Sequence, residues 1–195
     1  MLELVLASAN PDKSAEIRTI LGQALPDLVL LPRPADLGDI DETGQTLEEN
    51  ARLKAAAVAA HTGRPAVADD TGLEVAALRG APGVYSARYA GEHASYGENV
   101  AKLLGALVGV SDRRATFRTV AVVCWPDGRE VVAEGSVEGR IAETARGDSG
   151  FGYDPVFEPA EGGGRTLAEL GPEGKHRVSH RGRAFRALAA KLTSL

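Results

Sequence analysis

Residues 66–75 read AVADDTGLEV and place two aspartates, Asp69 and Asp70, side by side after an apolar run. The apolar residues 66–68 are typical of a buried strand, and we expect this strand to end where the acids begin. Two adjacent carboxylates repel each other, so they indicate either a solvated turn or a site that holds a positive group. Considered alone, the solvated turn is the more common explanation, and the choice depends on the rest of the chain.

Helix and strand patterns alternate on both sides of this stretch. Thr46 and Glu49 fit a capping box before an alanine-rich run, and Asp127-Gly128 is a strong hairpin signal between two apolar runs. The interleaving predicts an α/β fold whose sheet is at least partly antiparallel. The expected strands are residues 2–8, 28–31, 66–68, 115–125 and 129–137, the expected helices start near Asn10-Pro11, Thr46, Asn99 and Gly182, and the expected loops cover residues 32–44, 80–91 and 143–164.

The bulk composition is that of an ordinary globular protein. The chain has 195 residues, 44% of them hydrophobic and 25% charged, which is enough for one domain with a sizeable core or for two small lobes. The net charge of -5 argues against general nucleic-acid binding. The single cysteine, Cys124, excludes an internal disulfide and is expected to be a small buried hydrophobe. Because the sequence lacks a signal-peptide pattern and a membrane-spanning run, we expect a cytoplasmic protein without a membrane partner.

The segment between the first expected strand and the first expected helix is a candidate phosphate site. Open α/β folds place ligands at this position, and a helix N-terminus offers backbone N–H groups to an anion. Lys13 in the first turn is unfavourable against the helix dipole unless an anion is present. An ordinary helix cap with a solvated lysine explains the segment equally well. The residues concerned are Ser8, Ala9, Asn10, Pro11, Asp12 and Lys13.

A second acidic pair, Asp41 and Glu42, precedes the second expected helix. Mg²⁺ is usually bound through one or two carboxylates together with substrate phosphates. Two acidic clusters that face a lysine-bearing helix start would therefore suit Mg²⁺-assisted phosphate chemistry. The alternative for each cluster is a solvated turn, and Lys54 on the second helix, taken alone, is typical of a solvated helical face.

The glycine-rich stretch 147–154 reads GDSGFGYD. Its Gly-Asp-Ser-Gly string matches a serine-protease motif, but a catalytic triad is identified by geometry and the chain lacks the supporting context. The glycines would let the backbone approach a flat ligand. Phe151 and Tyr153 could then stack on a ring, and Asp154 could accept a hydrogen bond from a ring N–H. The alternative is a structural glycine loop with one aromatic side chain in the core.

A compact basic cluster precedes and opens the last expected helix. Its cations suit a phosphate group or the edge of a base, and the alternative is a solvated basic turn. The cluster consists of Lys175, Arg177, His180, Arg181 and Arg183.

Six segments together resemble one known family, the inosine triphosphate pyrophosphatase or Ham1-like family. The resemblance follows the family's order, covers nearly the whole chain, and is most specific at residues 69–91 and 150–157. The segments are LASANPDKSAEI (6–17), DETGQTLEENARLKA (41–55), AVADDTGLEVAALRGAPGVYSARYAG (66–91), GDSGFGYDPVFEP (147–159), TLAEL (166–170) and GKHRVSHRGRA (174–184).

The resemblance implies a fold, a reaction and partners. The fold would be a single domain over residues 1–195, elongated and two-lobed, with a cleft between the lobes, a long central mixed sheet and flanking helices. The reaction would be Mg²⁺-dependent hydrolysis of deaminated purine nucleotides (ITP, dITP and XTP) to the monophosphate and pyrophosphate. Members of the family usually form homodimers. The order of preference among the three substrates does not follow from the resemblance.

The resemblance also implies residue roles. Asp70 would activate water and bind metal, and either Asp41 or Glu42 would be the second metal ligand. The matching substrate-binding positions are Ser8, Ala9, Asn10, Pro11, Asp12 and Lys13 at the triphosphate, Lys54 facing the phosphates, Thr71 on the substrate, and Phe151, Gly152, Tyr153, Asp154, His180 and Arg181 at the base and sugar end, with Lys175 nearby. Departures from the family pattern are small: Ser8-Ala9 and Thr71 keep the expected hydroxyls, while Gly174 stands where an acid is usual.

Overall fold

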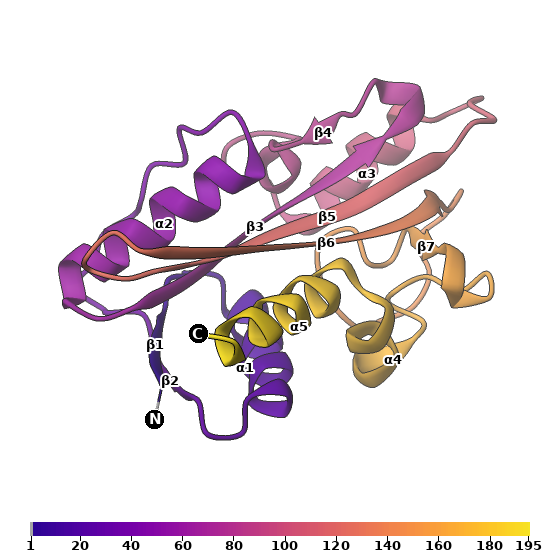
Figure 1. Cartoon of the computed structure of the whole chain (residues 1–195). Helices are drawn as coiled ribbons and strands as arrows, with labels where there is room; N and C mark the ends of the chain where they lie inside the picture. Colours follow the sequence, from indigo (N-terminus) through magenta and orange to yellow (C-terminus); the bar gives the residue numbers. More distant parts are fainter. Residues whose placement is uncertain (1) are drawn as a thin grey trace. The chain divides into compact units, whose positions relative to one another are not determined.

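The computed structural model describes residues 2–195 and has an α/β fold with a mixed sheet (Figure 1). The strands are β1 (Glu3–Leu6), β2 (Val29–Leu31), β3 (Ala66–Val75), β4 (Pro82–Gly83), β5 (Arg114–Cys124), β6 (Glu130–Ile141) and β7 (Phe157–Pro159). The helices are α1 (Pro11–Ala24), α2 (Leu47–Thr62), α3 (Tyr96–Ala106), α4 (Gly171–Val178) and α5 (His180–Thr193).

The sheet contains both parallel and antiparallel pairs, which confirms the expected fold class. Its strand order is β2-β1-β3-β5-β6-β7, and β4 pairs with β3 outside this path. β1 lies parallel to β2 and to β3, whereas β3–β4 and β6–β7 are antiparallel. No helix within residues 2–195 combines the length and the apolarity that a bilayer crossing requires.

The chain forms two compact units, each with its own apolar core. The first unit contains the described residues up to Asp70 together with Thr119–Gly135 and Arg183–Leu195, and the second contains Thr71–Arg118 and Ser136–Gly182. In the first unit, α1 and α5 lie on one face of the sheet and α2 lies on the other (Figure 1). Its core joins β1 and β3 to the apolar faces of α1 and α5, with Leu4, Leu6, Ile17, Ile20, Leu21, Val67, Phe185 and Leu188 buried.

The second unit is built around aromatic packing on β5. The Phe117 ring meets Phe157 edge to face, with centroids 5.2 Å apart, and stacks on His180 at 4.1 Å. Along β6 buried and exposed side chains alternate in the part that belongs to this unit, so one face of the strand joins the core. The core residues are Leu73, Val75, Leu103, Leu107, Phe117, Val137, Ile141, Tyr153, Val156, Phe157 and Leu167.

Several local predictions are confirmed. Asn10 caps α1 with Pro11 at its start, Thr46 and Glu49 form a complete capping box at α2, and Gly63 ends that helix in a left-handed conformation with φ +63°. Cys124 is buried. These features depend on a few neighbouring residues, which is why the local pattern was sufficient to predict them.

Other boundaries were wrong. β3 runs through the two acids to Val75 instead of ending at residue 68, and the basic cluster is partly helical, because α4 begins at Gly171. The expected loops 80–91 and 143–164 contain the short strands β4 and β7. β4 pairs with the end of β3 and β7 with the end of β6, and strands of two or three residues are too short to show an alternating pattern in the sequence.

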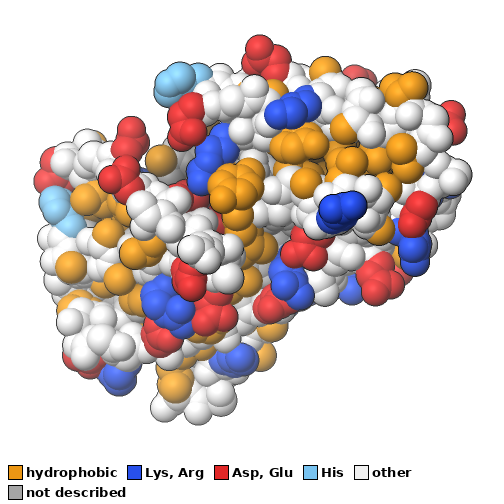
Figure 2. Space-filling view, turned by 90° about the horizontal axis from the view of Figure 1, so that it is seen from above, with side chains coloured by type: hydrophobic (Ala, Val, Ile, Leu, Met, Phe, Trp, Pro, Cys, Tyr) orange, Lys and Arg blue, Asp and Glu red, His pale blue; other side chains and the backbone are white. Residues whose placement is uncertain are grey.

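The charge pattern of the surface is mixed. Figure 2 shows acidic and basic side chains interspersed across one face, with apolar groups between them. This arrangement differs from the continuous basic surface with which many nucleic-acid-binding proteins contact phosphates.

Candidate active site

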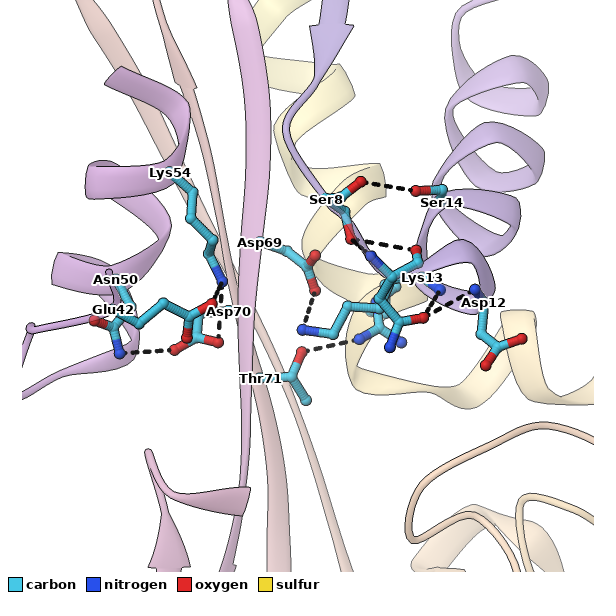
Figure 3. Close-up of polar contacts among 12 residues, drawn as sticks. Ser8, Asp12, Lys13, Ser14, Glu42, Asn50, Lys54, Asp69, Asp70 and Thr71 are labelled. Atoms are coloured by element: carbon cyan, nitrogen blue, oxygen red, sulfur yellow. Dashed lines mark hydrogen bonds and ion pairs between the residues drawn. The ribbon is translucent and has the colours of Figure 1, made fainter. Parts of the chain in front are cut away.

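The two aspartates of β3 point in opposite directions (Figure 3). Successive side chains of a strand alternate between the two faces of the sheet. Asp69 therefore faces α1, where the Lys13 Nζ lies 3.9 Å from its Oδ2. Asp70 faces α2, where the Lys54 Nζ lies 3.4 Å from its Oδ1. The strand continues through both acids because each carboxylate meets a lysine on its own face, which offsets the low strand propensity of aspartate.

Neither aspartate belongs to a solvated turn. Asp69 is 2% exposed and Asp70 is 5% exposed. A buried carboxylate needs a nearby cation or hydrogen-bond donors to offset its lost hydration. For Asp70 these are Lys54 and Asn50, whose Nδ2 donates to Asp70 Oδ2 at 3.2 Å. The alternative of a solvated turn is therefore wrong for this pair.

Glu42 completes the charged cluster around Lys54. The Lys54 Nζ donates to Glu42 Oε1 at 3.0 Å, and Lys54 is only 8% exposed. The alternative of a solvated helical face is therefore wrong for Lys54. Asp41 is exposed, whereas Glu42 is partly buried. Of the two acids predicted from the sequence, Glu42 is the one placed against Lys54 beside Asp70.

The pKa of Asp70 is raised above its ordinary value. Burial penalises the charged form and is the largest cause, and the neighbouring Glu42 and Asp69 add to it. Lys54 and Lys13 act in the opposite direction without cancelling the rise. A carboxylate with a raised pKa holds a proton more strongly, so Asp70 is a better base than an exposed aspartate.

The pKa of Lys54 is also raised. Burial alone would lower the pKa of this lysine, but the carboxylates of Asp70, Glu42 and Asp69 together outweigh burial. Lys54 therefore keeps its positive charge at neutral pH and lies between two acids, Glu42 and Asp70.

The loop before α1 is ordered by its own cap. Asn10 Oδ1 accepts hydrogen bonds from the backbone N–H groups of Asp12 at 2.9 Å and Lys13 at 3.1 Å. Ser8 Oγ accepts from the Asn10 N–H at 3.2 Å. Two of the backbone donors that the sequence offered to an anion are therefore used by Asn10. Asn10 Oδ1 would have to release them before they could bind a phosphate.

The second unit brings together another set of predicted residues. Lys175 forms an ion pair with Asp154, and its Nζ lies 4.5 Å from the centre of the Phe151 ring. The Arg181 guanidinium lies 5.4 Å from the same ring, and its Nη2 donates to Thr71 Oγ1 at 3.0 Å. Two cations therefore lie against the Phe151 ring, and one of them is paired with the Asp154 carboxylate.

The basic cluster is not a solvated turn. Lys175, His180 and Arg181 are 3%, 2% and 2% exposed. His180 is held flat against Phe117, so it belongs to the core of the unit as much as to the cluster. Arg177, by contrast, is exposed on α4.

The glycine-rich stretch 147–154 holds the Asp154 carboxylate close to its own backbone. Asp154 Oδ2 accepts from the Phe151 N–H at 2.8 Å. A Cβ added to Gly150 would lie 2.2 Å from this oxygen, and Gly150 has φ +79°, so a side chain here would displace the carboxylate. Tyr153 points into the core, where its hydroxyl donates to the Ser86 carbonyl at 2.9 Å. The two aromatics of the motif thus have different positions, and only Phe151 lies beside the cations.

Sequence reasoning missed Asn50, which is 0% exposed and was taken as part of a solvated face. The helical period contained a usable signal, because Leu47, Asn50, Ala51 and Lys54 lie on one face of α2 and all are buried. Polar residues on an otherwise apolar helical face indicate buried partners.

A separate cavity of about 800 Å³ lies within the second unit, beside β3, β5, β6 and β7. Charged side chains of both signs line it, among them Glu74, Arg114, Glu138 and Arg140. None of the residues predicted for the site lines this cavity.

A bound metal would have few protein ligands here. Residues 2–195 contain no group of three or more histidine, cysteine, aspartate and glutamate side chains placed to hold a metal ion. The two carboxylates of Asp70 and Glu42 match the smaller number that Mg²⁺ uses when phosphate oxygens supply other ligands.

Comparisons with known proteins found similar sequences and similar structures over the whole length of this chain. A protein of Streptomyces avermitilis named dITP/XTP pyrophosphatase is 47% identical over 100% of this chain and 99% of its own length. The structure of a HAM1 protein from Coxiella burnetii superposes with a TM-score of 0.89 at 44% identity and covers 100% of both chains. A structure named nucleoside-triphosphatase / dITP/XTP pyrophosphatase from Mycobacterium abscessus has a TM-score of 0.75 at 44% identity and covers 98% of this chain and 99% of its own. The sequence model of the Ham1 family matches residues 4–191, and the chain belongs to that family.

Proposed function

We propose that the protein hydrolyses deaminated purine nucleoside triphosphates (ITP, dITP and XTP) to the monophosphate and pyrophosphate. The observation that carries this proposal is the buried Asp70, held between Lys54 and Asn50 with a raised pKa. The names of full-length relatives, dITP/XTP pyrophosphatase, support the same reaction.

Asp70 acts as the general base in this proposal. Its carboxylate accepts a proton from the attacking water, and the resulting hydroxyl oxygen forms a bond to the α-phosphorus while the bond to the leaving pyrophosphate breaks. A base works best when its pKa approaches the working pH, and burial moves Asp70 in that direction. Asp69 supports Asp70 through its charge, and its own carboxylate faces Lys13.

Lys13 and Lys54, which lie on opposite faces of β3 (Figure 3), would bind the phosphates. Both ammonium groups are held near carboxylates before substrate arrives. Fixed positive charges stabilise the negative charge that develops on phosphate oxygens, because they need not reorient during the reaction. Lys54 exchanges part of its contact with Glu42 for contact with phosphate.

Asp70 and Glu42 would hold Mg²⁺. Their carboxylates are hard oxygen ligands of the type this ion prefers, and Asp41 is exposed and less suited. Bound Mg²⁺ supplies Lewis-acid stabilisation of charge on the phosphates. The fit is supported by the position of both acids around one cation, Lys54.

The base would be recognised by the Phe151 cluster. Lys175 and Arg181 are donors that match a 6-oxo group, and they are mismatched to the 6-amino group of adenine. The Phe151 ring offers a stacking surface, and Asp154 offers an acceptor for a ring N–H. Because Lys175, His180 and Arg181 are buried, a small ligand suits them better than an extended nucleic acid.

The remaining expectations concern the whole chain. We propose a single functional domain, a homodimer as the assembly, and the cytoplasm, where nucleotide pools lie, as the location. Analytical ultracentrifugation of the purified chain tests the dimer, and a sedimentation coefficient of a monomer at micromolar concentration would contradict it.

A substrate panel tests the proposed function. Pyrophosphate release is measured from ITP, dITP, XTP, ATP, GTP and a modified pyrimidine triphosphate, each with Mg²⁺ and with EDTA. We expect kcat/KM for the deaminated purines to exceed that for ATP by about 10⁴-fold, because buried donors reject a mismatched edge strongly. Equal rates for ITP and ATP, preference for the pyrimidine, or full activity in EDTA would contradict the proposal.

A further inference from the structure

Helices α2 and α3 begin in the same way. Each has a capping box at its N-terminus, Thr46 with Glu49 in α2 and Ser95 with Glu98 in α3. In each helix the residue after the box glutamate is an asparagine, Asn50 or Asn99, with exposures of 0% and 3%. The two units therefore repeat one arrangement, a capped helix start followed by a buried asparagine.

Each asparagine fastens the loop that precedes its helix. Asn50 Oδ1 accepts from the Gly44 N–H at 2.8 Å, and Asn99 Oδ1 accepts from the Ala90 N–H at 2.7 Å. Because the acceptor end of each amide is fixed by a backbone N–H, the orientation of its donor end is fixed as well.

The donor ends differ. Asn99 Nδ2 donates to the backbone carbonyl of Ala87 at 3.1 Å, so this asparagine only joins one loop to one helix. Asn50 Nδ2 donates to the side chain of Asp70 at 3.2 Å. The amide of the buried asparagine therefore donates to a backbone carbonyl in the second unit and to the proposed base in the first.

We infer that Asn50 is a positioning residue that sets the separation and orientation of Asp70 and Glu42, an inference that rests on the proposed function. Its amide links the Asp70 carboxylate to the backbone of Gly44, two residues after Glu42. The bond to Asp70 Oδ2 fixes the rotation of the carboxylate and leaves Oδ1 directed at Lys54. Asn50 thereby couples the metal-binding loop to the base through one buried side chain.

Gly44 provides an independent reason for this coupling. A Cβ at residue 44 would lie 2.6 Å from Asn50 Oδ1 and 2.9 Å from the Asn50 backbone nitrogen. A side chain at this position would push the loop away from the amide. The close approach of the loop to Asn50 thus requires glycine.

The decisive comparison pairs Asn50→Leu with Asn99→Leu. Both substitutions keep similar volume and remove a buried amide that fastens a loop, so both should lower the thermal midpoint. Only Asn50→Leu should lower kcat for ITP hydrolysis and weaken Mn²⁺ binding to the nucleotide-free protein, each by about 10- to 100-fold, as expected for partners that orient metal ligands. Mn²⁺ binding is measured by electron paramagnetic resonance, and KM for ITP should change less than kcat.

A second pair keeps the test decisive if Asn50→Leu does not fold. Gly44→Ala should lower kcat and Mn²⁺ affinity in the same direction, whereas Gly22→Ala on α1, where an added Cβ meets nothing within 4 Å, should leave both at wild-type values. Wild-type kcat and Mn²⁺ affinity in Gly44→Ala, or equal losses in Asn50→Leu and Asn99→Leu, would overturn the inference.

The two levels of the proposal fail separately. If the wild-type protein releases no pyrophosphate from any triphosphate, the proposed function is wrong, and the Mn²⁺ measurement still tests Asn50. If wild type is active while Asn50→Leu and Gly44→Ala match it, only the positioning role is wrong.

Discussion

At the scale of residues, the alternation of side chains along β3 explains how two adjacent aspartates can both be buried, because their carboxylates lie on opposite faces of the sheet. The local sequence left open whether Asp69 and Asp70 form a solvated turn or hold a positive group, and each carboxylate meets a lysine. It could not predict that they do so on opposite faces, because the expected strand stopped at residue 68. For Lys54 the local pattern left a solvated helical face as the alternative, although the apolar residues Leu47 and Ala51 mark this face of α2 as buried.

The raised pKa of Asp70 predicts how pH affects stability without metal. The folded state binds the proton of Asp70 more tightly than the unfolded chain, whose carboxyl titrates near 3.8. Between that value and the higher folded pKa, the free energy of unfolding therefore falls as pH rises. In EDTA, the thermal midpoint of Asp70→Asn minus that of wild type should increase with pH across this window. The attraction to Lys54 acts only on the ionised carboxylate and is already part of the folded pKa of Asp70, so it does not reverse this trend. A difference that shrinks as pH rises would contradict the assignment.

The buried ion pair of Lys175 and Asp154 predicts a large loss of stability. Removing one partner leaves the other charge buried, at a cost of about 3–5 kcal/mol. Lys175→Met should therefore lower the free energy of unfolding in urea by this amount. Adding Asp154→Asn removes the stranded charge and should restore part of the loss. Equal free energies of unfolding for Lys175→Met and wild type would show that the ion pair does not contribute to stability.

At the scale of elements, the starts of α1 and α2 were the most predictable features and α4 was the least, while α3 begins at Tyr96 and not near Asn99 as expected. Asn10-Pro11 and the Thr46 capping box each indicate a helix start within four residues. Helix α4 has eight residues, contains Pro172 and Gly174, and buries only Lys175 and Val178, so it carries no apolar period. Its acid in the first turn and its three basic residues in the last turn favour the helix dipole, a weaker signal than periodicity.

The capping boxes predict matched effects on stability. Thr46 Oγ1 accepts from the Glu49 N–H at 3.1 Å, and Ser95 Oγ accepts from the Glu98 N–H at 3.3 Å. Thr46→Ala and Ser95→Ala should each lower the free energy of unfolding by about 1 kcal/mol, because one backbone donor loses its partner. Urea denaturation measures both, and a change near zero in either variant would mean that water replaces that cap without cost.

At the scale of the whole molecule, composition and the order of elements were sufficient for the fold class. The alternation of helices and strands predicted a mixed α/β sheet, and the family resemblance covered the chain from end to end. The division into two units was not readable from the sequence, because β3, β5 and β6 each run from one unit into the other without a linker. The residues that the resemblance assigns to the phosphates, 8–13 and Lys54, belong to the first unit, whereas Thr71 and the residues assigned to the base and sugar end belong to the second.

The central claim is that water activated by Asp70 attacks the α-phosphorus of a deaminated purine triphosphate. The direct measurement is the hydrolysis of ITP with Mg²⁺ in water enriched in heavy oxygen, followed by mass spectrometry of both products. We predict that one labelled oxygen appears in inosine monophosphate, that pyrophosphate stays unlabelled, and that Asp70→Asn forms neither product at a rate above about one hundredth of wild type. Label in pyrophosphate, release of orthophosphate, or undiminished turnover by Asp70→Asn would contradict the account.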